Sequence, residues 1–163
     1  FDMLWMIDFP LFEWDDDDKR YQPAHHLFTS PTADTIDLIS DNPGQVKAQH
    51  YDMVINGNEV ASGSVRIHQW AVQQQILEVL NLAPEDIKTR FGYFIEALQY
   101  GTPPHAGIAP GLDRLVMLML GEDNIREVIA FPKTQRGACL MTGAPSVVSK
   151  AQLEELSIRI DDV

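Results

Sequence analysis

The chain has 163 residues, of which 45% are hydrophobic and 22% are charged, and its formal net charge is −12. This length and composition predict one globular domain, and the charge argues against bulk electrostatic attraction to nucleic acid or to an anionic membrane. The one cysteine excludes an internal disulfide and a cysteine-based zinc site, and no apolar run reaches the roughly 20 residues that span a bilayer. We therefore expect a cytoplasmic protein with no membrane partner.

The first 45 residues or so are predicted to contain one strand followed by loops. Residues 4–9 are strand-like, and Pro10 ends the strand. The acidic run at residues 15–18 predicts a solvated loop. His25 and His26 come next and open a stretch rich in turn-forming residues.

A hairpin signal follows at residues 51–60, where Asn56 and Gly57 form the dipeptide typical of a two-residue type I′ turn. Such a turn places Asp52 and Glu59 diagonally on the same face of the two strands. Paired carboxylates on one face suit Mg²⁺, which takes one or two carboxylates and leaves its other positions to water and phosphates. Two solvated acids on an exposed face are the alternative.

Helical periodicity predicts helices over residues 70–80, 84–100 and 112–120. The third is apolar on nearly every side, so we expect it to be buried. Short strands are predicted over residues 105–109 and near residues 137–141. Ser149 and Gln152 form a capping-box pattern for a last short helix.

Arg114 falls in the first turn of the predicted helix over residues 112–120, where the helix N-terminus already carries partial positive charge. An arginine there is suited to an anion. A phosphate fits well, because the guanidinium binds two oxygens at once and the helix terminus adds N–H donors. A structural ion pair with Asp113 or another acid is the alternative.

Arg66 lies in an apolar strand at residues 65–68, just after the small residues 61–64, which let another group approach the backbone closely. A buried arginine needs an anionic partner, either an internal acid or a substrate carboxylate. A flat strand would turn Arg66 away from Glu59, and a bulge at Gly63 would return it to that face. One of the neighbours His25 and His26 is a candidate to close over a ligand, with a solvated loop pair as the alternative.

These segments resemble a known enzyme family. Gly107-Ile108-Ala109-Pro110-Gly111-Leu112-Asp113-Arg114 resembles motif 3 of class II aminoacyl-tRNA synthetases. Further segments are similar, in the same order, to bacterial-type aspartyl-tRNA synthetases: residues 7–13, 25–31, 51–57, 63–68, 100–105 and 129–134. The resemblance covers almost the whole chain and implies an α+β fold, an antiparallel sheet flanked by helices that forms part of a class II catalytic core.

The resemblance also implies an ATP site. Arg114 would bind the γ-phosphate as the catalytic arginine, while Gly111, Leu112 and Asp113 would line the nucleotide pocket. Glu59 would bind ATP as well. In this family the carboxylate of aspartate attacks the α-phosphate of ATP, which gives aspartyl-adenylate and pyrophosphate, and the aspartyl group then passes to the terminal ribose of tRNA(Asp).

The remaining implied roles concern the metal and the amino acid. Asp52 and Glu59 would hold Mg²⁺. Arg66 would bind the side-chain carboxylate of L-aspartate, and His25 would contact the amino acid from a mobile loop. Small departures from the family pattern occur at Asn58, where an aromatic is usual, and at residues 61–62, where glycines are usual.

Several family parts are not found in this sequence: the anticodon-binding barrel, the dimerisation motif, motif 2 with its α-phosphate arginine, and an inserted domain. The chain as a whole, residues 1–163, is thus expected to be the C-terminal portion of the catalytic domain, inactive by itself and part of a homodimer in the full-length enzyme. An asparagine synthetase-like ligase and a stand-alone module that binds ATP or aspartate are the alternatives.

Overall fold

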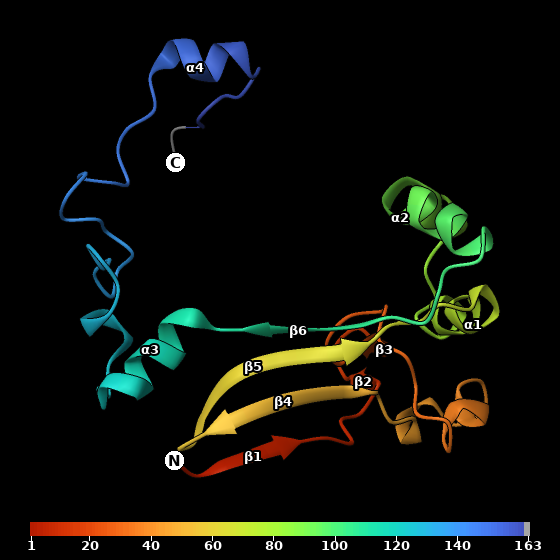
Figure 1. Cartoon of the computed structure of the whole chain (residues 1–163). Coiled ribbons are helices and arrows are strands. Elements are labelled where there is room, and N and C mark those ends of the chain that lie inside the picture. Colours follow the sequence, from red (N-terminus) through yellow and green to blue (C-terminus); the bar gives the residue numbers. More distant parts are fainter. Residues whose placement is uncertain (162–163) are drawn as a thin grey trace. The chain divides into compact units, whose positions relative to one another are not determined.

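The fold, in a computed structural model that describes residues 1–161, is α+β and contains an antiparallel sheet, as expected. Its four strands follow the order β1-β4-β5-β6 (Figure 1). They are β1 (Met3–Met6), β4 (His50–Ile55), β5 (Asn58–Val65) and β6 (Ala106–Pro110). The chain divides into two compact units, residues 1–115 and the residues that follow; the whole sheet lies in the first.

The central β4–β5 hairpin forms where the sequence predicts it. Asn56 and Gly57 have φ angles of 50° and 78°, so both turn residues adopt the left-handed conformation that a type I′ turn needs. The predicted two-residue turn is confirmed, because Ile55 pairs with Asn58 and Val54 pairs with Glu59. This hairpin provides the strands on which most of the candidate site is built.

A close approach between β5 and β6 depends on Gly63. A Cβ atom added there would lie 2.2 Å from the carbonyl oxygen of Gly107 and 2.6 Å from the Tyr51 ring. The Tyr51 hydroxyl donates to that same carbonyl over 3.0 Å. The expectation that the small residues admit a close neighbour is therefore confirmed, and the neighbour is strand β6.

A second hairpin, β2 (Phe12–Asp15) and β3 (Arg20–Pro23), was not predicted. Residues 16–18 of the acidic run are exposed, as expected, but they form the turn of this hairpin rather than a free loop, and Asp15 ends β2. The Asp15 carboxylate accepts hydrogen bonds from the backbone N–H groups of Asp17 and Asp18, at 2.9 and 3.0 Å. Strands of four residues are too short to give a clear alternating pattern.

The hydrophobic core lies beside the sheet rather than beneath all of it. It joins the β2–β3 hairpin, the segment around the short 3₁₀ helices Ile36–Leu38 and Pro43–Gln45, and helix α1 (Trp70–Val79). The buried members are Leu11, Phe12, Ile39, Val46, Ala48, Ile67, Ile76 and Leu80. This core anchors the end of β5 at which Arg66 lies.

Helices α1 and α2 (Pro84–Gln99) match their predicted ranges within one residue at each end. The apolar stripe of α2 is its least exposed face, and Leu98 is its buried residue. Gly101 follows the end of α2 and has a φ of 92°, in the left-handed region that favours glycine. Within residues 1–161, no helix is long and apolar enough to span a lipid bilayer.

Helix α3 (Leu112–Leu120) has the predicted bounds but not the predicted burial. Only Met117 is buried, whereas Leu112, Met119 and Leu120 are 72%, 77% and 66% exposed. The expectation of a buried helix is therefore wrong for the described chain. The physical reason is that α3 follows an edge strand, β6, and the described residues do not supply enough surface to cover a helix that is apolar on several sides.

The second unit contains a 3₁₀ helix (Ile125–Glu127) and helix α4 (Lys150–Glu155). The predicted capping box is confirmed, since the Ser149 hydroxyl accepts from the Gln152 N–H and the Gln152 side chain accepts from the Ser149 N–H. The strand predicted near residues 137–141 is absent from the described residues. Local turns replace it, because backbone groups there bond to near neighbours, as from Cys139 N–H to the Ala144 carbonyl.

Candidate active site

Polar side chains line one face of the β4–β5 ladder at the end away from the turn. His50 and Asp52 lie two residues apart on β4, so they share a face. Across the ladder, His50 pairs with Ser64 and Asp52 pairs with Ser62, which puts both hydroxyls on that face too. His50, Asp52 and Ser64 are 6%, 8% and 1% exposed. Buried polar groups in such a row indicate a site rather than a packing surface.

A β-bulge brings Arg66 onto this face. The register shifts between Met53 and Val54, so that Val60 on β5 is the extra residue. Beyond the bulge the even-numbered residues of β5 share the face of His50 and Asp52, and Arg66 continues that series. Glu59, before the bulge, faces the same side because it pairs with Val54. Arg66 can share the face of Glu59 only if β5 contains a bulge, which the sequence analysis considered at Gly63. In the structure the bulge lies at Val60.

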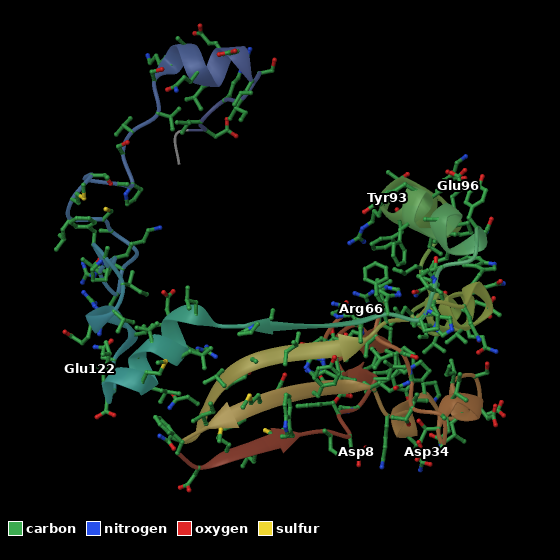
Figure 2. The ribbon with its side chains drawn as sticks, viewed as in Figure 1. Asp8, Asp34, Arg66, Tyr93, Glu96 and Glu122 are labelled. Carbon is green, nitrogen blue, oxygen red and sulfur yellow. The ribbon has the colours of Figure 1, made fainter. Side chains whose placement is uncertain are left out.

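Arg66 lies directly after β5, and Figure 2 labels it at the end of the sheet away from the β4–β5 turn. Its Nη1 contacts the His26 ring, 3.1 Å from Nδ1. Burial and the neighbouring Arg66 charge lower the pKa of His26 to about 4. The His26 ring is therefore neutral at physiological pH. Within residues 1–161, Arg66 forms no ion pair with an acid.

The segment that follows the histidine pair is held in place by several neighbours. Gln73, buried in α1, donates from its Nε2 to the Leu27 carbonyl over 2.9 Å. Thr29 forms a bridge with Arg66, and Phe28 packs against Phe94 with ring centroids 4.6 Å apart. These contacts fix the backbone directly after His25 and His26.

His25 and His26 point to different partners, as expected for neighbours in an extended segment. The His25 ring stacks on His50, with centroids 3.7 Å apart and an angle of 27° between the planes. Burial and the nearby His50 lower the pKa of His25, while Asp52 and Glu59 act in the opposite direction. Both candidate carboxylates therefore act electrostatically on the ring proposed to contact the amino acid.

Asp52 and Glu59 have different surroundings. The Asp52 carboxylate is buried and lies 3.0 Å from His50 Nε2. The Glu59 side chain is 52% exposed and lies 3.8 Å from Arg114 Nη1. Among residues 1–161 no cluster of three or more histidine, cysteine or acidic side chains could hold a metal ion. Two carboxylates alone still match the oxygen donors that Mg²⁺ uses beside a nucleotide, so the Mg²⁺ site stays a prediction.

Arg114 lies at the other end of the ladder, in the first turn of α3. Its Nη1 donates to the Glu59 carbonyl oxygen over 2.6 Å, and its side chain is 49% exposed. Gly111 precedes the helix and donates its N–H to the Val60 carbonyl over 2.8 Å, which ties the start of α3 to β5. The motif that includes Leu112 and Asp113 is exposed.

Sequence reasoning missed His50, Ser62 and Ser64, and it did not give His26 a partner. One signal was available. His50 directly precedes the predicted strand and lies two residues before Asp52, and Ser62 and Ser64 are likewise spaced by two. In a strand this period places polar side chains on one face. The pairing of Arg66 with His26 had no such signal, because it joins residues 40 positions apart.

Comparison with known proteins agrees with the fold and the motifs. The family model of the class II tRNA synthetases (D, K and N) matches residues 1–135. The chain belongs to this family. It is 50% identical over 159 residues to an aspartate–tRNA(Asp/Asn) ligase of Geotalea uraniireducens (strain Rf4), and the match covers 98% of this chain but only 27% of that protein. The chain thus spans about a quarter of that relative.

Solved structures show the same relationship. The chain is 28% identical to the aspartyl-tRNA synthetase of Entamoeba histolytica, with a TM-score of 0.58 over 83% of this chain and 23% of that one. It is 25% identical to the asparaginyl-tRNA synthetase of the same organism, with a TM-score of 0.58 over 83% of this chain and 26% of that one. The α+β fold is therefore that of part of a class II synthetase.

Proposed function

We propose that this chain is the C-terminal portion of the catalytic domain of a longer aspartate–tRNA ligase. That enzyme activates L-aspartate with ATP and transfers the aspartyl group to tRNA(Asp). The observation that carries the proposal is the half-buried Arg66, whose side chain meets a neutral His26 ring and no acid within residues 1–161. An arginine fork on a polar, largely buried face is suited to a carboxylate.

The amino-acid subsite is then formed by Arg66 and His25. Arg66 binds the side-chain carboxylate of aspartate, and a second guanidinium nitrogen allows a bidentate contact. His25 contacts the amino acid from the loop above the sheet. An asparagine side chain presents an amide nitrogen that cannot accept from Arg66, so this contact favours aspartate over asparagine.

The nucleotide subsite is formed by Glu59, Asp52 and the motif that ends at Arg114. Arg114 binds the γ-phosphate with its fork and the α3 N-terminus adds N–H donors, while Gly111, Leu112 and Asp113 line the pocket. Asp52 and Glu59 would hold Mg²⁺, which supplies charge neutralisation on the phosphates when bound. The residues of this chain thus orient the aspartate carboxylate toward the α-phosphate and hold the leaving pyrophosphate.

The wider assignments follow from the same proposal. The partners would be L-aspartate, ATP and tRNA(Asp), and the full-length enzyme would act as a homodimer in the cytoplasm. We expect the 163-residue chain alone to be inactive, since it does not contain the arginine that such enzymes use on the α-phosphate. The two alternatives, an asparagine synthetase-like ligase and a stand-alone binding module, are not favoured by the 50% identity to an aspartate–tRNA ligase.

The test is ATP–pyrophosphate exchange with the longer protein that carries this chain. We expect exchange that depends on L-aspartate, with asparagine at least tenfold poorer, followed by aspartylation of tRNA(Asp). The isolated chain serves as the control and should give no exchange. A longer protein that forms adenylate equally well with asparagine, or only forms free asparagine from aspartate and ammonia, would rule the proposal out.

A further inference from the structure

We propose that His50 is a positioning residue that fixes Asp52 and His25 together, and so links the nucleotide subsite to the aspartate subsite. This inference rests on the proposed function and deepens it. His50 does not itself touch a substrate. It acts through two side chains that do, by means of a hydrogen bond to one and a ring stack with the other.

The link to Asp52 is a buried hydrogen bond. His50 Nε2 lies 3.0 Å from Asp52 Oδ1 and 3.3 Å from the Ser62 hydroxyl. His50 is 6% exposed, so water does not compete freely for this contact. A buried carboxylate that loses its donor is costly to keep in place. Of the two carboxylate oxygens, the bond engages Oδ1, which fixes the rotamer of the side chain and thereby the direction of the other oxygen.

The link to His25 is a ring stack. The two imidazoles lie 3.7 Å apart at 27°, and the Phe9 ring contacts both of them edge-on, with centroids at 5.1 Å from His25 and 4.9 Å from His50. Phe9 and His50 together form two sides of a slot for the His25 ring. The neighbouring His26 contacts Arg66 and Thr29 instead. The position of the His25 ring therefore depends on its contacts with Phe9 and His50.

The two contacts use different parts of the His50 ring. Only Nε2 takes part in the hydrogen bond, while the flat face makes the stack. The other nitrogen, Nδ1, is buried and has no hydrogen-bond partner within residues 1–161. The hydrogen bond and the stack can therefore be removed one at a time by substitution, and the loss of Nδ1 removes no contact.

The experiment measures ATP–pyrophosphate exchange by the longer protein with three variants. His50→Gln keeps a side-chain N–H at the same number of bonds from Cα as Nε2, but it has no ring. His50→Phe keeps the ring and has no N–H donor. His50→Ala removes both. The KM values for ATP·Mg²⁺ and for L-aspartate are measured separately, and thermal melting of each variant reports whether it is folded.

The expected result is a crossed pattern. His50→Phe raises the KM for ATP·Mg²⁺ about tenfold or more, because Asp52 loses its donor, and leaves the KM for aspartate within about twofold. His50→Gln does the opposite, with an increase of about two- to tenfold in the KM for aspartate because the stack is lost. His50→Ala raises both. A purely structural role would move both KM values together in every variant.

Two results would overturn the inference. If His50→Gln and His50→Phe change both KM values in parallel with their melting temperatures, His50 only supports the fold. If all three variants keep both KM values, His50 has no role in either subsite. Failure of the proposed function is distinguishable, because it shows in the unsubstituted protein as an absence of aspartate-dependent exchange, whereas failure of this inference shows only in the variants.

Discussion

The two ends of the β4–β5 ladder differ in how completely this chain builds them. At one end His50 and Asp52 are buried, bonded to each other and covered by the histidine loop. At the turn end Glu59 and Arg114 are about half exposed, and their carboxylate–guanidinium distance is 3.8 Å. An exposed pair of this kind contributes little to stability, about 1 kcal/mol or less, so it leaves both side chains free to rearrange around a ligand.

The two proposed subsites therefore differ in how far this chain holds their side chains in place. The end that would bind aspartate is pre-organised, with side chains held by neighbours before any substrate arrives. Of the groups that would bind ATP, Asp52 belongs to the buried end, whereas Glu59, Arg114 and Leu112 are exposed. We infer that the nucleotide subsite depends on further protein in the longer enzyme, while the aspartate subsite is mostly contained here.

The largest effect is expected at the buried end, from Arg66→Ala in the longer enzyme. Loss of one partner of a desolvated charge pair costs roughly 2–5 kcal/mol, which corresponds to a fall in kcat/KM for aspartate of about 30- to several thousand-fold. Aspartate-dependent pyrophosphate exchange measures it. The control is Arg126→Ala, an exposed arginine in the second unit, which should leave the rate unchanged. An Arg66→Ala enzyme with normal aspartate kinetics would remove the basis of the proposed amino-acid subsite.

A smaller effect is expected at the exposed end, from Arg114→Ala. Loss of a charge-assisted contact to a phosphate should cost about 1.5–3 kcal/mol and appear in the KM for ATP or in kcat, with the KM for aspartate almost unchanged. Stability should change by no more than about 0.5 kcal/mol, as for most surface substitutions. A variant that unfolds instead would show that the bond from Arg114 to the Glu59 carbonyl is structural.

Between the two ends, Gly63→Ala tests the ladder itself. The new Cβ would lie 2.2 Å from the Gly107 carbonyl and 2.9 Å from Ile108 Cα, so β5 and β6 must separate. We expect destabilisation of about 1–3 kcal/mol in urea unfolding of the longer protein. Gly107→Ala is the matched control on the partner strand, because its added Cβ meets nothing within 4 Å. Equal losses from both substitutions would contradict the close approach at Gly63.

The hairpin and the helices could be predicted from the sequence, because each depends on local signals, whereas the roles of the charged site residues stay predictions. The Asn56-Gly57 turn fixed one register, and helical periodicity gave the bounds of α1 to α3 within one residue. The sequence did not predict the bulge at Val60, since two successive apolar residues on a strand are equally compatible with a regular ladder. That one extra residue decides whether Arg66 faces Glu59 or the opposite side.

Features that depend on distant partners were the ones missed. The contact between Arg66 and His26 and the stack of His25 on His50 join segments far apart in the chain. The burial of α3 was wrong for a related reason: hydrophobicity reports what a helix would bury against a complete protein, and the described residues present only part of that surface. Burial predicted from sequence therefore needs the rest of the fold as context.

The smallest effect concerns the pH dependence of the buried end. The pKa of His26 is about 4 in the folded protein and near 6.5 in an unfolded chain. The unfolded state therefore binds more protons between these values, so this contribution to stability is complete above about pH 6.5 and is lost as the pH falls toward 4. Because the ring is only partly buried, we expect less than about 1 kcal/mol between pH 7 and pH 5.

The measurement is urea unfolding of the longer protein at pH 7 and pH 5, for the unsubstituted chain and for His26→Gln, which keeps a polar side chain that does not titrate. The unsubstituted protein should lose more stability on acidification than the variant. His25, whose pKa is also lowered by burial, adds a change of the same sign in both proteins, so it cancels in the comparison. If His26→Gln loses as much stability as the unsubstituted protein, then Arg66 and burial do not hold His26 neutral, and the buried end is less pre-organised than its contacts indicate.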